Sequence, residues 1–240
     1  MIDDPLITAL LAPILIPQGV YTRMVTLKLP EATGKRNGIS GKGAPLSLLI
    51  LGDTAAAGVG VEKQSEALAG KLVTKLSSHY KLEWRLEAET GLSTLNIIER
   101  LKGLEVFCVD VVIISLGVND VTGGVSVKKW LGLQEELRSI LVTKFNVKLV
   151  LLSSIPPMSR FPSLPQPLRW YLGRKSKLFN TKLLSQTNQR SDLEYLDINF
   201  PLQDSYIAKD GFHPSEAAYE YWSELVAKKI KLSFKSIQEY

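Results

Sequence analysis

Short apolar runs that alternate with amphipathic stretches constrain the fold of this chain most strongly. Residues 46–51 (LSLLIL) and 109–116 (VDVVIISL) are nearly continuous apolar runs, which is typical of strands buried on both faces of a sheet. Between them, residues 61–79 carry a stripe of apolar side chains at helical spacing. Strands that alternate with helices favour a parallel sheet covered on both faces, so we expect an α/β fold.

The alternation continues through the rest of the chain. Further strands are expected at 82–88, 148–153 and 194–198, and helices near 95–101, from 127, at 168–188 and from near Pro214. Together with the two apolar runs, this predicts five parallel strands. The stretch 155–167 (IPPMSRFPSLPQP) holds five prolines and is expected to be largely irregular, in a position where it could border a site.

The first 45 residues differ from the remainder. Residues 5–20 are apolar but contain Pro13 and Pro17, which we expect to interrupt a helix, and the run is shorter than the ~20 residues of a membrane span. We expect an arm lying on the protein surface, with weak peripheral membrane contact through an interfacial anchor, or an atypical signal, as open alternatives.

Residues 31–45 (EATGKRNGISGKGAP) are rich in glycine and polar side chains and predict a flexible connector. We therefore divide the chain into an arm with its connector, residues 1–45, and one domain, residues 46–240.

Composition excludes several classes of function. The net charge of +5 comes from basic residues scattered through the chain, which argues against nucleic-acid binding. A single cysteine, Cys108, excludes an internal disulfide and is expected to pack as a small apolar side chain. Two histidines do not favour a His-rich metal site, so we expect no metal and no cofactor. We expect a cytoplasmic protein.

Three short motifs supply the groups that acyl transfer requires. They are residues 52–54 (Gly-Asp-Thr), 117–120 (Gly-Val-Asn-Asp) and 210–213 (Asp-Gly-Phe-His). Each follows a predicted strand or the loop after one, and the carboxyl ends of parallel strands share one edge of the sheet. A hydroxyl, a side-chain amide and an imidazole with a nearby carboxylate therefore meet there, as a nucleophile, an oxyanion donor and a general base.

The pattern resembles the SGNH/GDSL hydrolase superfamily over about residues 46–230. Residues 50–60 (ILGDTAAAGVG) are similar to its first block, Gly91 matches the glycine of the second, residues 117–120 match the third, and residues 210–214 (DGFHP) match the last. The resemblance implies a three-layer α/β/α sandwich of flavodoxin-like type with a central five-stranded parallel sheet. It also implies hydrolysis of esters or thioesters, in some members acyl transfer, without a metal ion.

The resemblance also implies roles for single residues. Thr54 stands where the family has its nucleophilic serine, and His213 would be the general base, with Asp210 holding the other ring nitrogen. The oxyanion hole would combine the backbone N–H of Thr54, the N–H of Gly91 and the side chain of Asn119. Small or medium acyl esters are the expected substrates.

Other interpretations of the same residues stay open. Thr54 could be a helix cap, residues 119–120 a turn, and residues 213–214 only the start of a helix, with Pro214 at its first position. The additional methyl group of Thr54 restricts its side-chain rotamers and could crowd the tetrahedral intermediate. The alternatives to a hydrolase are therefore a catalytically impaired binding module that keeps the pocket, and an acyltransferase.

Overall fold

The computed structural model describes residues 5–188, 190–200 and 203–238. One six-stranded sheet, with the strand order β1-β3-β2-β4-β5-β6, forms its centre. The strands are β1 (Asn37–Ser40), β2 (Ala44–Gly52), β3 (Tyr80–Ala88), β4 (Val111–Ser115), β5 (Leu149–Ser153) and β6 (Leu193–Leu196). The α-helices are α1 (Pro5–Val25), α2 (Leu68–Ser77), α3 (Thr94–Gly103), α4 (Val118–Thr122), α5 (Val127–Phe145), α6 (Leu168–Thr187) and α7 (Glu216–Gln238).

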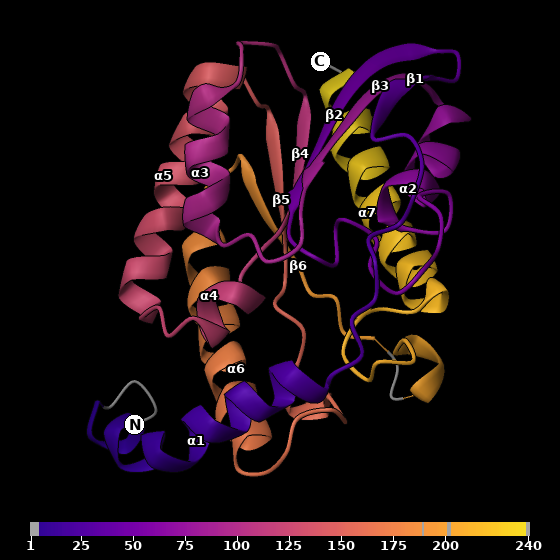
Figure 1. Ribbon diagram of the computed structural model, residues 1–240. Coiled ribbons are helices and arrows are strands. Elements are labelled where there is room, and N and C mark those ends of the chain that lie inside the picture. The colour runs from indigo at the N-terminus through magenta and orange to yellow at the C-terminus, as the bar shows by residue number, and fades with distance from the viewer. Residues whose placement is uncertain (1–4, 189, 201–202, 239–240) are drawn as a thin grey trace.

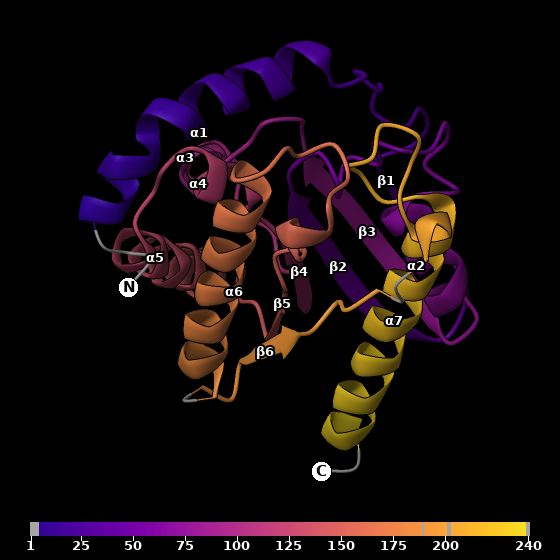
Figure 2. The same ribbon diagram turned by 90° about the horizontal axis from the view of Figure 1, so that it is seen from below.

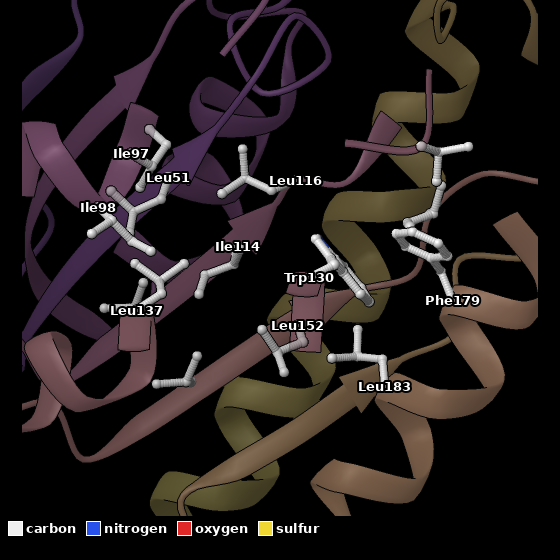
Figure 3. Packing of buried hydrophobic residues seen from close by; sticks show 14 of the residues in the cluster. Leu51, Ile97, Ile98, Ile114, Leu116, Trp130, Leu137, Leu152, Phe179 and Leu183 are labelled. Carbon is white, nitrogen blue, oxygen red and sulfur yellow. The ribbon is translucent and has the colours of Figure 1, made fainter. Parts of the chain in front are cut away.

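Helices cover both faces of the sheet and make three layers (Figure 1). Helices α3, α5 and α6 lie on one face, and α2 and α7 lie on the other. Along β2 the side chains alternate: Leu49 and Leu51 join the core under α3, α5 and α6, while Leu48 and Ile50 join the core under α2 and α7. Figure 3 shows the first of these cores, where Leu51 lies near Ile97. The predicted α/β/α sandwich is confirmed.

The sheet differs from the prediction at one edge. Strands β2 to β6 pair in parallel, as expected, but β1 pairs antiparallel with β3 and adds a sixth strand. The prediction of a flexible connector at residues 31–45 is therefore wrong, since β1 and the start of β2 lie within it. Glycine-rich sequence hid this edge strand, because Gly38 has no side chain to contribute to a hydrophobic pattern.

The prolines of the first segment do not interrupt its helix. Helix α1 runs without a break through Pro13 and Pro17, contrary to the prediction. It lies apart from the sheet, across the end of the molecule where α6 begins (Figures 1 and 2). Hydrogen bonds of the Gln18 side chain join it there to residues 166–168.

Two smaller predictions are also corrected. Helix α2 begins at Leu68 and not near residue 61, because residues 54–67 are folded into consecutive turns. Cys108 is exposed and does not pack in the core, although the apolar residues around it suggested that it would.

A buried polar cluster ties three helices together beside the end of β4. The hydroxyl of Thr94 donates to Asp120 at 2.8 Å and accepts from the indole of Trp130 and the amide of Gln134, both at 3.2 Å. The backbone N–H of Thr94 also donates to Asp120. Burial raises the pKa of Asp120 in spite of these bonds. The cluster fixes α4, which carries Asn119, against α3 and α5.

We predict that Thr94→Val lowers the free energy of unfolding by about 2–4 kcal/mol, because it removes the hydroxyl bond to Asp120 and the acceptor of the buried Trp130 and Gln134 donors. Chemical denaturation measures the change. Thr143→Val is the matched control, since Thr143 is exposed on α5 and bonds only the carbonyl of Ser139; it should change stability by less than about 0.5 kcal/mol. Equal stabilities for both variants would show that the cluster contributes nothing.

Candidate active site

A cavity of about 290 Å³ opens at the carboxyl ends of the parallel strands. Its walls come from the loops that follow β2, β4, β5 and β6, and from the loop before α7. Thr54, Asn119 and His213 all line it. The structure thus brings three predicted site residues together, although they are spread over some 160 positions of the sequence. Apolar side chains form most of the remaining wall.

Thr54 lies on a tight turn directly after β2. The carbonyl of Asp53 accepts from the N–H of Ala57 at 2.9 Å, and the carbonyl of Thr54 accepts from the N–H of Val59 at 3.2 Å. Because α2 starts only at Leu68, Thr54 does not cap a helix. Within the described ranges, its hydroxyl has no hydrogen-bond partner, so it is available to a molecule in the cavity.

His213 and Asp210 form a pair. Nδ1 of His213 lies 2.5 Å from Oδ2 of Asp210, whose side chain is fully buried. Burial works against the charge of Asp210, but the His213 ring and the N–H groups of His213 and Phe212 outweigh it, so the pKa of Asp210 lies below its usual range. A carboxylate that accepts from Nδ1 leaves Nε2 of the neutral ring with its lone pair, which is the form of a general base.

Contrary to the prediction, Pro214 does not occupy the first position of a helix. Helix α7 begins two residues later, at Glu216, and the hydroxyl of Ser215 accepts from the N–H of Ala218 at its start. Pro214 instead pairs with Ile207 in an isolated bridge. His213 therefore lies outside the helix, and its orientation depends on Asp210 and not on a helix dipole.

The turn after Thr54 packs directly against the loop of His213. Gly60 has a φ of +109°, and a Cβ added there would lie 2.1 Å from the carbonyl oxygen of Pro214. The hydroxyl of Tyr219 on α7 lies 2.8 Å from the carbonyl oxygen of Ala55 and 2.7 Å from that of Val59. Burial raises the pKa of Tyr219 well above its usual value, so the hydroxyl stays a donor. These contacts hold the two loops at one end of the cavity.

The predicted oxyanion donors differ in their surroundings. The N–H of Thr54 and the N–H of Gly91 bond no group in the described part of the chain. Gly91 has a φ of +86° and is not among the residues that line the cavity. The Asn119 amide donates to the carbonyl of Leu92 at 3.0 Å and, more weakly, to Oδ2 of Asp53 at 3.4 Å. An oxyanion could replace the longer of these bonds.

Asp53 is buried beneath the turn and lines the cavity. Burial raises its pKa to about 7, although the N–H of Ala55 and the nearby His213 act in the opposite direction. Asp53 is thus a carboxyl that gains and loses its proton near neutral pH, between the nucleophile position and Asn119.

Several residues that support the site were missed by the sequence analysis. The carboxylate of Glu31 accepts from the N–H and hydroxyl of Thr90, next to Gly91, and the hydroxyl of Ser163 donates to the carbonyl of Asp210. Neither belongs to a motif, so no local pattern could have indicated them. The irregular segment 155–167 does border the cavity: Phe161 lines it and stacks 4.6 Å from Phe212.

No group of three or more His, Cys, Asp or Glu side chains suited to a metal ion occurs among the described residues.

A hydroxyl and a carboxylate-oriented imidazole at the carboxyl ends of the strands of an α/β/α sandwich are typical of hydrolases that use a hydroxyl nucleophile. Within this class, the chain belongs to the GDSL-like lipase/acylhydrolase family, whose sequence profile matches residues 50–221. This membership supports ester hydrolysis in general. No curated protein sequence matches the chain.

Solved structures of esterases and lipases share the fold. A lipase from a goat rumen metagenome is 20% identical, covers 75% of this chain and 95% of its own, and has a TM-score of 0.58. The psychrotrophic esterase EstA from Pseudoalteromonas sp. is 21% identical, with coverages of 79% and 98% and a TM-score of 0.57. A carbohydrate acetylesterase from Sinorhizobium meliloti is 17% identical, with coverages of 78% and 99% and a TM-score of 0.55.

We predict that Asp53 makes the stability of the protein fall as pH rises. Its folded-state pKa of about 7 exceeds the ordinary 3.8, so between these values the folded protein keeps a proton that the unfolded chain has lost. The stability that Asp53 contributes is complete below pH 3.8 and is lost as pH rises through about 7. The free energy of unfolding of Asp53→Asn, measured in urea relative to that of the natural protein, should therefore be about 2–3 kcal/mol higher at pH 8 than at pH 5.

The control for this experiment is Asp197→Asn, the same substitution at an exposed carboxyl. It should show no such difference between pH 5 and pH 8. An Asp53→Asn variant whose stability relative to the natural protein is the same at both pH values would contradict the raised pKa.

Proposed function

We propose that the protein hydrolyses carboxylic esters or thioesters without a metal ion, with Thr54 as the nucleophile. One observation carries most of the proposal: His213, which is hydrogen-bonded to the buried Asp210, lines the same cavity as Thr54, whose hydroxyl has no partner among the described residues. Family membership supports the reaction type, because acylhydrolases cleave such bonds. Two of the structural relatives, a lipase and an acetylesterase, also bear the names of ester hydrolases.

In the proposed reaction, Nε2 of His213 takes the proton of the Thr54 hydroxyl while Oγ1 attacks the acyl carbon. Asp210 stabilises the imidazolium that forms. When the tetrahedral intermediate collapses, the imidazolium gives its proton to the departing alcohol or thiol, and the acyl group stays on Thr54. Water then attacks this ester, with its proton passing to Nε2, and the acid is released with the Thr54 hydroxyl restored.

The developing oxyanion would be held by N–H donors around the cavity. The N–H groups of Thr54 and Gly91 are unbonded, and Asn119 contributes its amide once the 3.4 Å contact with Asp53 is given up. Protonation of Asp53 weakens that contact, because a neutral carboxyl accepts less strongly than a carboxylate. Loss of one oxyanion donor typically lowers the rate by about 10²–10³.

The cavity favours an apolar acyl group of small or medium size. Its wall includes Ile155, Phe161, Ile198 and Phe212, and Arg160 adds a basic side chain. The indole N–H of Trp222, buried in the same wall, has no partner among the described residues. A substrate oxygen that reached it would gain a hydrogen bond that the protein itself does not make.

A second function, binding without turnover, is favoured by one feature of Thr54. Its hydroxyl makes no hydrogen bond to His213, and its β-branch limits the rotamers that could bring the two together. If the methyl group prevents attack, the protein keeps a pocket for acyl groups and loses the chemistry. The same scaffold would then be a binding module.

A series of variants separates these functions. We predict measurable hydrolysis of p-nitrophenyl acetate and butyrate by the natural protein, unaffected by EDTA. Thr54→Val keeps the side-chain shape and removes the nucleophile, so kcat/KM should fall by at least about 10³. The kcat/KM of His213→Ala should fall by a similar factor, because the general base is lost. His79→Ala is the matched control, since His79 is exposed at the end of α2, and it should retain full activity.

Thr54→Ser distinguishes the two functions. An active natural protein whose Thr54→Ser variant is equally or more active agrees with a threonine nucleophile. An inactive natural protein with an active Thr54→Ser variant identifies the binding module. Natural activity that survives Thr54→Val would refute Thr54 as the nucleophile.

A further inference from the structure

Helix α1 has an unusual distribution of polar and apolar side chains. Its side toward the protein carries three hydrogen-bonding residues and two that pack against the core, at intervals of three and four: Thr8, Leu11, Leu15, Gln18 and Thr22. Gln18 donates to the carbonyl of Gln166 at 2.7 Å and accepts from the N–H of Leu168 at 3.1 Å. The hydroxyls of Thr8 and Tyr171 lie 3.0 Å apart. These polar contacts tie the helix to α6.

The opposite side of α1 is apolar and exposed. At the same intervals it presents Leu6, Leu10, Pro13, Pro17, Val20 and Met24. Leu10 is 79% exposed and Met24 77% exposed. With Ile14, Ile16, Tyr21 and Val25 at its flanks, this face spans roughly half of the helix circumference at 100° per residue. A helix that faced only water would have the reverse arrangement.

We propose that this face of α1 docks on the surface of a lipid bilayer, with the helix lying in the plane of the interface. A flat surface covers half of a helix that is partly immersed in it, which matches the width of the apolar face. Leu6–Val25 is long and apolar enough to cross a membrane by length and composition, and little of it is buried. Its residues therefore suit the acyl region of a bilayer.

The charges of the segment that contains α1 also favour a lipid surface as the partner of the apolar face. Residues 5–30 contain Arg23 and Lys28, both exposed, and no Asp or Glu. Basic residues beside an apolar face are attracted to anionic lipids. The apolar area supplies most of the affinity, since two basic residues contribute only about 1 kcal/mol each.

The contacts with α6 favour a helix that lies along the surface and does not span the bilayer. Spanning would break the bonds of Gln18 to residues 166–168 and place polar side chains in hydrocarbon. The same bonds connect α1 to the segment that begins with Ile155–Phe161, which forms one wall of the cavity. The docked surface would therefore lie beside the cavity.

Flotation of the full chain with vesicles tests the proposal independently of catalysis. We expect the protein to float with vesicles that contain about one quarter phosphatidylglycerol in phosphatidylcholine, and to float less with phosphatidylcholine alone. Leu10→Glu/Met24→Glu should lower binding at least about tenfold, because two charges replace immersed apolar groups. Val106→Glu/Leu232→Glu is the matched control, since these apolar residues are 72% and 58% exposed elsewhere, and it should bind like the natural protein.

Three results would overturn the proposal. One is no flotation with either vesicle. Another is a natural protein that is dimeric by light scattering while Leu10→Glu/Met24→Glu is monomeric, which would assign the face to a second copy. The third is resistance to extraction at alkaline pH, which would show that α1 spans the bilayer. Circular dichroism and thermal melting check that each variant folds. All four substituted residues are exposed, so the substitutions leave the core packing unchanged.

Discussion

Gly52 and Ser115 end the two central strands, β2 and β4, and lie opposite one another in their parallel ladder. A Cβ on Gly52 would lie 2.4 Å from the Cβ of Ala56 and 2.8 Å from the carbonyl oxygen of Ser115. No side chain fits there, so the turn after β2 folds down against the end of β4, where the N–H of Asp53 donates to Ser115. This close approach sets Thr54 beside the loop that carries Asn119. The arrangement of the site therefore depends on one missing side chain.

Much of the fold could be predicted because the buried strands have distinctive sequences. Residues 109–116 are rich in β-branched side chains and contain β4. The helix predicted at residues 168–188 differs from α6 by one residue at its end. The failures occur where tertiary contacts override local preference. Helix α1 passes through two prolines because Gln18 and its neighbours bond to α6, and β1 forms because the edge of β3 offers unpaired backbone groups. Neither contact leaves a trace in the local sequence.

For the site, the motif residues could be named from the sequence, but their supports could not. Thr54, Asn119 and His213 each lie in a recognisable block, and parallel strands must bring such blocks to one edge. The groups that hold them act over long sequence separations: Tyr219 bonds the turn after Thr54, and Glu31 bonds Thr90. Their roles require coordinates, as does the burial that raises the pKa of Asp53 to about 7.

The segment before the family match is bonded to two loops of the domain. The family profile begins at residue 50, yet Gln18 bonds the end of the segment that forms one wall of the cavity, and Glu31 bonds Thr90 in the loop that carries Gly91. The N-terminal segment is in this sense a part of the site.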